Sequence, residues 1–117
     1  MIELRDEGEV VTIEVTGEID VSNARTLGQR LRRSVPSTAT EVVLVLSPLQ
    51  YLDSTGVRML FDLRQWLEQD GKRLVAVVAP DAVVRPVLDV VGLSTHVAVH
   101  PSVDAARRGV ASGRHPA

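Results

Sequence analysis

The amino-acid sequence predicts an α/β fold: a mixed four- to five-stranded β-sheet with about four α-helices. Three observations predict it. The chain opens with two segments of alternating polarity separated by turn residues, later segments switch between strand-like and helical periodicity, and the 117 residues suffice for only one hydrophobic core. Strands joined through helices prefer parallel crossovers, so the sheet should be parallel after its first hairpin. The sequence leaves open whether helices cover one face of the sheet or both.

The N-terminal part of the chain predicts a hairpin, a helix and a central strand. Residues 2–5 and 10–15 alternate in polarity, and Asp6-Glu7-Gly8 between them is typical of a turn. Residues 21–35 have helical spacing, which is carried by Ala24, Leu27, Leu31 and Val35. The run EVVLVLS, residues 41–47, is almost continuously apolar, as in a strand that is buried on both faces.

The next segments predict a helix and a second core strand. Residues 56–69 carry an apolar stripe at helical spacing, and Gly71 is well placed to end that helix. The segment RLVAVVA, residues 73–79, predicts another buried strand.

Residues 80–92 predict a helix that Asp81 opens and Gly92 closes. Pro86 lies inside it and would cost about 3 kcal/mol in a helix interior, so the helix must either start late or be kinked. Residues 96–99 predict a short edge strand, and a last helix is expected from Ser102 to about Val110. The final residues, 113–117, are expected to form a flexible tail.

Composition argues against several classes of function. A formal charge of −2 and only three aromatic residues give little affinity for nucleic acid, and the charged N-terminus does not fit a signal peptide. The apolar region from Leu74 to Leu93 has membrane-spanning length but contains charges and two prolines. The absence of cysteine fits a reducing cytoplasm. We therefore expect a cytoplasmic protein with no membrane insertion, nucleic acid or cofactor.

The segment Asp53-Ser54-Thr55-Gly56 carries the most distinctive chemistry, and a catalytic role is the first of four interpretations. A serine nucleophile needs a base within hydrogen-bond reach, yet neighbouring residues on a strand-to-helix turn point in different directions. The G-x-S-x-G elbow is missing, the three histidines lie near the C-terminus, and none has metal-ligand spacing. We therefore expect no catalytic residue and no metal site.

The other three interpretations are a phosphate-binding loop, a helix cap and a phosphorylation site. One glycine and no lysine make a poor phosphate loop, and Asp53 would repel the ligand. Asp, Ser and Thr are favoured helix caps, worth about 1 kcal/mol. A kinase could equally modify an exposed Ser54, adding roughly −1.5 to −2 charges that the helix dipole favours and Asp53 opposes. Such a modification would change the surface potential and leave the fold intact.

Three segments resemble the STAS domains, and among these the bacterial anti-sigma-factor antagonists. The first is VTGEIDVSNARTL, residues 15–27, the second is VVLVLSPLQYLDSTGVRML, residues 42–60, and the third is PDAVVRPVLDVVGL, residues 80–93. The resemblance implies a single STAS domain over residues 1–112. The middle segment is the most specific because it resembles the family's D-S-[ST]-G phosphorylation turn.

The resemblance also implies a regulatory cycle. In such antagonists the unphosphorylated protein binds an anti-sigma factor that has ATP-dependent serine kinase activity, and this releases a sigma factor. The kinase then phosphorylates the serine after the motif aspartate, here Ser54, and a serine phosphatase restores the active form. STAS domains also serve as accessory modules of transport systems, including intermembrane lipid transport, and that alternative needs no phosphorylation.

The resemblance implies that Asp20, Asp53, Thr55 and Gly56 take part in partner binding around Ser54. Three of these residues have a plainer alternative: Asp20 could cap the first helix, Thr55 could cap the second, and Gly56 could be a steric requirement of the turn. Arg58 lies about one helical turn after Ser54, so it could reach a phosphate or Asp53. Its alternative is a solvated surface charge.

Overall fold

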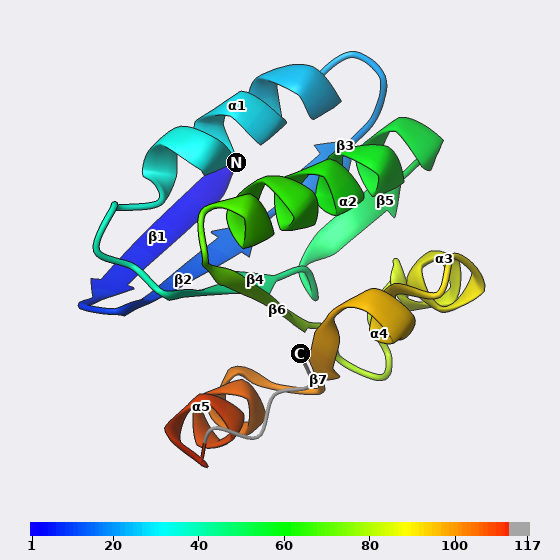
Figure 1. Cartoon of the computed structure of the whole chain (residues 1–117). Helices are drawn as coiled ribbons and strands as arrows, with labels where there is room; N and C mark the ends of the chain where they lie inside the picture. Colours follow the sequence, from blue (N-terminus) through cyan, green and yellow to red (C-terminus); the bar gives the residue numbers. More distant parts are fainter. Residues whose placement is uncertain (113–117) are drawn as a thin grey trace.

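The hairpin predicted at the start of the chain is present as β1 (Ile2–Glu7) and β2 (Val10–Val15), which pair antiparallel. The structure is a computed structural model that describes residues 1–112. Beyond the hairpin, β4 (Glu41–Val45), β6 (Arg73–Val77) and β7 (Ala98–His100) continue the sheet in parallel, in the order β1-β2-β4-β6-β7. The prediction of a mixed five-stranded sheet in an α/β fold is confirmed (Figure 1).

The largely apolar sequence of β4 suits its central position in the sheet, where all five of its residues are buried. Val42 and Leu44 point into one core, whereas Val43 and Val45 point into a second core on the other face. A strand flanked by parallel neighbours and covered on both faces has no exposed surface that polar side chains could occupy.

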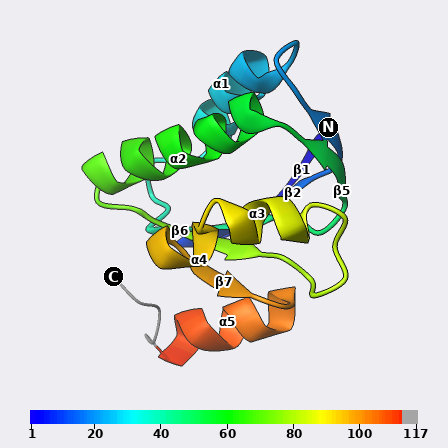
Figure 2. The ribbon, with the colours of Figure 1, turned by 90° about the vertical axis from the view of Figure 1, so that its right-hand side faces the viewer.

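Helices cover both faces of the sheet, which settles the question that the sequence left open. α1 (Ala24–Ser34) and α2 (Ser54–Gln69) lie side by side on one face, and α5 (Val103–Ser112) lies on the other (Figures 1 and 2). Leu31 and Leu63 pack with the strands on the first face, and Ala106 packs on the second. α2 ends as predicted, since Gly71 adopts φ +72° just after it.

A second, two-stranded sheet was not predicted from the sequence. It pairs β3 (Gly17–Ile19) in parallel with β5 (Leu49–Leu52), just before the loops that lead into α1 and α2. Gly17 has φ +91°, which lets the chain leave β2 and bend into β3. The small sheet therefore places residues 20–23 next to the DSTG segment.

The helix predicted over residues 80–92 starts late, which is one of the two options that Pro86 left open, and Gly92 follows its end as predicted. α3 (Arg85–Val90) begins late, with Val84 rather than Asp81 at its N-cap, and Pro86 lies in its first turn. A proline is tolerated there because the first helical amides have no intrahelical partner. After the turn at Gly92, a separate α4 (Leu93–His96) leads to β7, giving five helices in residues 1–112 instead of about four.

The apolar region from Leu74 to Leu93 is divided between β6, α3 and the first residue of α4. Within residues 1–112, no helix has the length and apolarity needed to cross a membrane. The segment expected to be a flexible tail, residues 113–117, lies outside the described residues.

Candidate functional site

Two loops meet at the end of the small β3–β5 sheet and form the candidate site. One is the β3–α1 loop, residues 20–23, and the other is the junction of β5 and α2 at Asp53. The backbone N–H of Asp53 donates to the carbonyl of Ile19 over 3.2 Å. Residues more than thirty positions apart in the sequence are thereby fixed beside each other.

Asp53 caps α2, and its carboxylate also reaches across to the other loop. Its Oδ1 accepts from the N–H of Gly56 at 3.0 Å, and its Oδ2 accepts from the N–H of Val21 at 3.2 Å. The capping interpretation is therefore confirmed for Asp53. Because both carboxylate oxygens bond backbone amides, the carboxylate is held as a structural acceptor and is not aimed at the neighbouring serine as a base.

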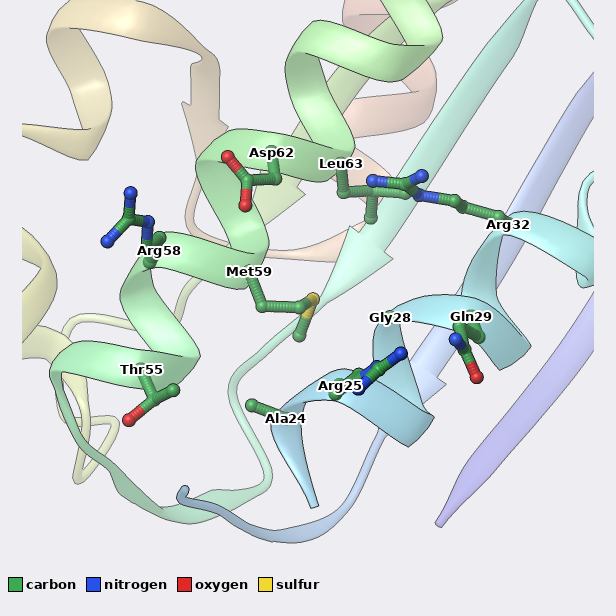
Figure 3. Close-up of a pocket in the computed structure, with 10 residues that line it drawn as sticks. All are labelled: Ala24, Arg25, Gly28, Gln29, Arg32, Thr55, Arg58, Met59, Asp62 and Leu63. Carbon is green, nitrogen blue, oxygen red and sulfur yellow. The ribbon is translucent and has the colours of Figure 1, made fainter. Parts of the chain in front are cut away.

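Ser54 is the first residue of α2, and its side chain is exposed. Its hydroxyl has no hydrogen-bond partner among the described residues. Thr55 is half-buried and lines a hollow between α1 and α2 (Figure 3). Of the two neighbouring hydroxyl groups, that of Ser54 is thus the more accessible to another protein.

Gly56 is buried beneath the serine. A Cβ at this position would lie 2.5 Å from Cδ1 of Leu52 and 2.8 Å from Cγ2 of Ile19. The absent side chain lets the first turn of α2 rest directly on β3 and β5. Gly56 therefore has the steric role that the sequence offered as its plainer alternative, and it supports the surface from below.

Asp20 organises the β3–α1 loop. Its Oδ1 accepts from both the hydroxyl and the N–H of Ser22, and these bonds lower the pKa of its carboxyl below the ordinary value of 3.8. Asn23 locks the same loop by accepting from the Asp20 N–H at 2.9 Å and donating to the Glu18 carbonyl at 2.8 Å. The helix begins at Ala24 with Asn23 at the N-cap position, so the alternative in which Asp20 is the cap of α1 is wrong.

Arg58 is exposed one turn along α2 and has neither an ion pair nor a hydrogen bond to Asp53 in the structure. It borders a hollow of about 320 Å³ between α1 and α2, which also contains Arg25 and Arg32 (Figure 3). The hollow was not predicted from the sequence. The spacing of Arg25, Gln29 and Arg32 does indicate that they share one face of α1, and this face borders the hollow.

The structure thus brings most of the predicted residues to one end of the domain. Asp20, Asp53 and Ser54 meet where the two loops are linked, while Thr55 and Arg58 extend the same surface along α2. Val21 was not singled out, although its N–H makes the direct link and its side chain is 77% exposed.

Comparisons with known proteins identify the family of the chain. The family model for the STAS domain matches residues 1–106. The anti-sigma-F factor antagonist RsfB of Mycobacterium tuberculosis is 27% identical over 113 residues, which cover 97% of this chain and 91% of that protein.

Two solved structures have closely similar folds. The crystal structure of an anti-sigma factor antagonist from Mycobacterium paratuberculosis matches with a TM-score of 0.81 and 26% identity, over 95% of this chain and 93% of that one. The unphosphorylated anti-sigma factor antagonist SpoIIAA matches with a TM-score of 0.74 over 97% of both chains, at 19% identity, and this likeness concerns the fold alone.

Proposed function

The chain belongs to the STAS domain family, and we propose that it is an anti-sigma-factor antagonist whose binding is controlled by phosphorylation of Ser54. In this proposal the unphosphorylated chain binds an anti-sigma factor and so frees a sigma factor for transcription. The relatives named as anti-sigma factor antagonists align with almost the whole chain, which supports the first part. The second part rests on the geometry around Ser54.

The observation that carries the proposal is the exposed, unbonded hydroxyl of Ser54 beside a carboxylate that is held by two backbone amides. A protein kinase can approach such a hydroxyl without unfolding the helix. Because two backbone amides hold the Asp53 carboxylate next to Ser54, a phosphate on Ser54 would have a negative charge beside it. The local structure therefore tolerates modification and responds to it electrostatically.

The added charge should weaken binding far more than folding. A phosphoryl group brings roughly −1.5 to −2 charges to a position that is solvated in the free protein, where the N-terminal dipole of α2 partly balances it. In a complex the same group would be desolvated, and an unpaired buried charge costs several kcal/mol. The modification thus acts on the partner equilibrium while the domain stays folded.

The surface around Ser54 has the chemistry of a protein interface. Val21 and Tyr51 expose 77% and 49% of their surface on the two segments that flank the serine. Exposed apolar side chains beside polar groups favour protein contacts. In the proposal, Asp20, Thr55 and Arg58 provide the polar part of this interface.

The regulatory cycle needs two enzymes besides this chain. We propose that the bound anti-sigma factor is itself the ATP-dependent serine kinase and that a serine phosphatase hydrolyses the phosphoserine. The chain then serves as a cytoplasmic substrate and binding module, and it has no catalytic step of its own. Its cycle links sigma-factor activity to the balance between kinase and phosphatase.

The test is affinity capture with three forms of the chain: wild type, Ser54→Ala and Ser54→Asp. Wild type and Ser54→Ala should retain an anti-sigma factor that Ser54→Asp loses, and incubation of the captured complex with ATP should label Ser54 in wild type alone. Ser37→Asp, which adds a carboxylate to an exposed serine in the α1–β4 loop, is the matched control and should bind normally.

Retention of the anti-sigma factor by Ser54→Asp, together with an unlabelled Ser54, would contradict the phosphorylation switch. Capture of a transport system in place of an anti-sigma factor would support the transport-module alternative.

A further inference from the structure

Helix α1 concentrates positive charge on a chain whose formal charge is −2. It contains four arginines, Arg25, Arg30, Arg32 and Arg33, and no acidic residue. All four side chains are exposed, and none forms an ion pair with a described residue. Several arginines elsewhere in the described residues are paired with carboxylates, for example Arg64 with Glu68 and Arg85 with Asp89. The charge on α1 is therefore available to a partner.

Two of these arginines border the hollow between α1 and α2. Arg25 and Arg32 are seven residues apart, with Gln29 between them, so they form a stripe on the face of α1 that borders the hollow. The apolar part of the lining consists of Ala24, Gly28, Met59 and Leu63, while Arg58 and the carboxylate of Asp62 line the hollow on the α2 side. Figure 3 shows the Met59 side chain pointing from α2 toward α1, where the two helices approach closely at Gly28.

Arg32 is held in position before any partner binds. Its guanidinium carbon lies 5.4 Å from the centroid of the Trp66 ring, and Figure 3 shows its side chain extending from α1 toward α2. Stacking on an aromatic face leaves the N–H groups at the guanidinium edge free to bind a carboxylate in a bidentate manner. This contact reduces the entropy cost of ordering the long side chain when a partner binds.

We propose that the hollow between α1 and α2 is the docking site for an acidic segment of the anti-sigma factor. Carboxylates of that segment bind Arg25 and Arg32, and an apolar side chain between them rests against Met59 and Leu63. Guanidinium groups beside an apolar surface suit a peptide that carries both acidic and apolar side chains. A small anion would leave the apolar surface unused. The inference rests on the proposed function, because it identifies a second contact for the same partner.

The hollow lies close to Ser54, so a partner bound there would be held near the proposed phosphorylation site. Thr55 and Arg58 lie on its border and are the neighbours of Ser54 along α2. A segment anchored on Arg25 and Arg32 would therefore tether the kinase beside its target hydroxyl. Such a tether adds affinity without touching Ser54 itself, so it persists in part after phosphorylation.

The experiment measures the dissociation constant between the purified chain and the anti-sigma factor identified by capture, using isothermal titration calorimetry. The Arg25→Glu/Arg32→Glu variant should raise the constant by about tenfold or more, because two charge pairs become repulsive. The matched control, Arg30→Glu/Arg33→Glu, has the same charge change on the same helix outside the hollow and should raise it by no more than about threefold. The wild-type constant should also rise with salt concentration.

Each alternative result overturns the proposal. Equal effects of the two double variants would mean that only the overall charge of α1 matters. A wild type that dimerises in sedimentation velocity, and that Arg25→Glu/Arg32→Glu converts to monomer, would assign the hollow to a second copy of the chain. Failure of wild type to bind any anti-sigma factor would contradict the proposed function itself, and the docking assignment would fall with it. Circular dichroism checks that both double variants are folded.

Discussion

The backbone N–H of Val21 donates to Oδ2 of Asp53 across 3.2 Å, and this bond joins the loop before α1 to the first residue before α2. The same carboxylate caps α2 through Gly56. One side chain therefore fixes the geometry on both sides of Ser54. The surface that a partner meets is set by this carboxylate before any partner binds.

Replacement of Asp53 should destabilise the domain. Asp53→Ala leaves the amides of Gly56 and Val21 without their acceptors, and we expect a loss of about 1–2 kcal/mol in the free energy of unfolding. Urea denaturation measures this value. Ser54→Ala is the control, because it removes an exposed hydroxyl that bonds none of the described residues, and it should change stability by less than about 0.5 kcal/mol. Equal stabilities of the two variants would show that the carboxylate is not structural.

Substitution of Gly56 should damage the site through packing. The Cβ of Gly56→Ala would lie 2.5 Å from Leu52 and 2.8 Å from Ile19, so α2 must shift outward. Overpacking of this kind costs about 1–3 kcal/mol, more than the better helix propensity of alanine recovers. Thermal unfolding tests this expectation, with Thr55→Ala at the neighbouring half-buried position as the control. A melting temperature as high as that of wild type would contradict the close packing.

Asp20 should make stability depend on pH in the acidic range. Its hydrogen bonds to Ser22 lower the pKa of its carboxyl below 3.8 in the folded state, so the ionised form stabilises folding above pH 3.8. This contribution is lost as the pH falls below 3.8 through the folded-state pKa. NMR titration of the Asp20 carboxyl carbon should show that Ser22→Ala raises its pKa toward 3.8. An unchanged titration in Ser22→Ala would exclude the Ser22 hydroxyl as a cause, since the backbone N–H of residue 22 is kept in that variant.

Arg58 should affect binding more than folding. Its side chain is exposed and has no ion pair within residues 1–112, so Arg58→Ala should leave the free energy of unfolding within about 0.5 kcal/mol of wild type. We expect weaker binding of the anti-sigma factor or a changed rate of phosphate removal from Ser54, since a guanidinium near a phosphate alters both. Arg30→Ala on α1 is the comparison. Binding and dephosphorylation identical to wild type would assign Arg58 to the solvated surface.

The main sheet could be predicted because its signals are local. The polarity of β1 and β2 and the apolar run of β4 each specify an element without reference to the rest of the chain. The β3–β5 sheet could not be predicted in this way. β3 has only three residues, and it is stabilised by pairing with a segment about thirty residues away.

The site was predictable to a similar extent. Asp53 and Ser54 stand out because a cap and a hydroxyl at a helix start have a residue pattern of their own. The link from Val21 uses a backbone amide, which carries no sequence signal, and the burial of Gly56 depends on Ile19 from a distant strand. Pro86 correctly indicated a late start of α3, but the sequence pattern did not show that Val84 would occupy the N-cap.

The central claim is that phosphorylation of Ser54 breaks the complex with an anti-sigma factor. The most direct measurement compares the dissociation constants of the unphosphorylated chain and of the chain phosphorylated at Ser54 by the captured kinase, with the modified residue identified by peptide mass spectrometry. The account predicts that phosphorylation raises the constant by about a hundredfold or more, in keeping with an uncompensated interfacial charge worth several kcal/mol. Equal constants for the two forms, with both folded by circular dichroism, would contradict it.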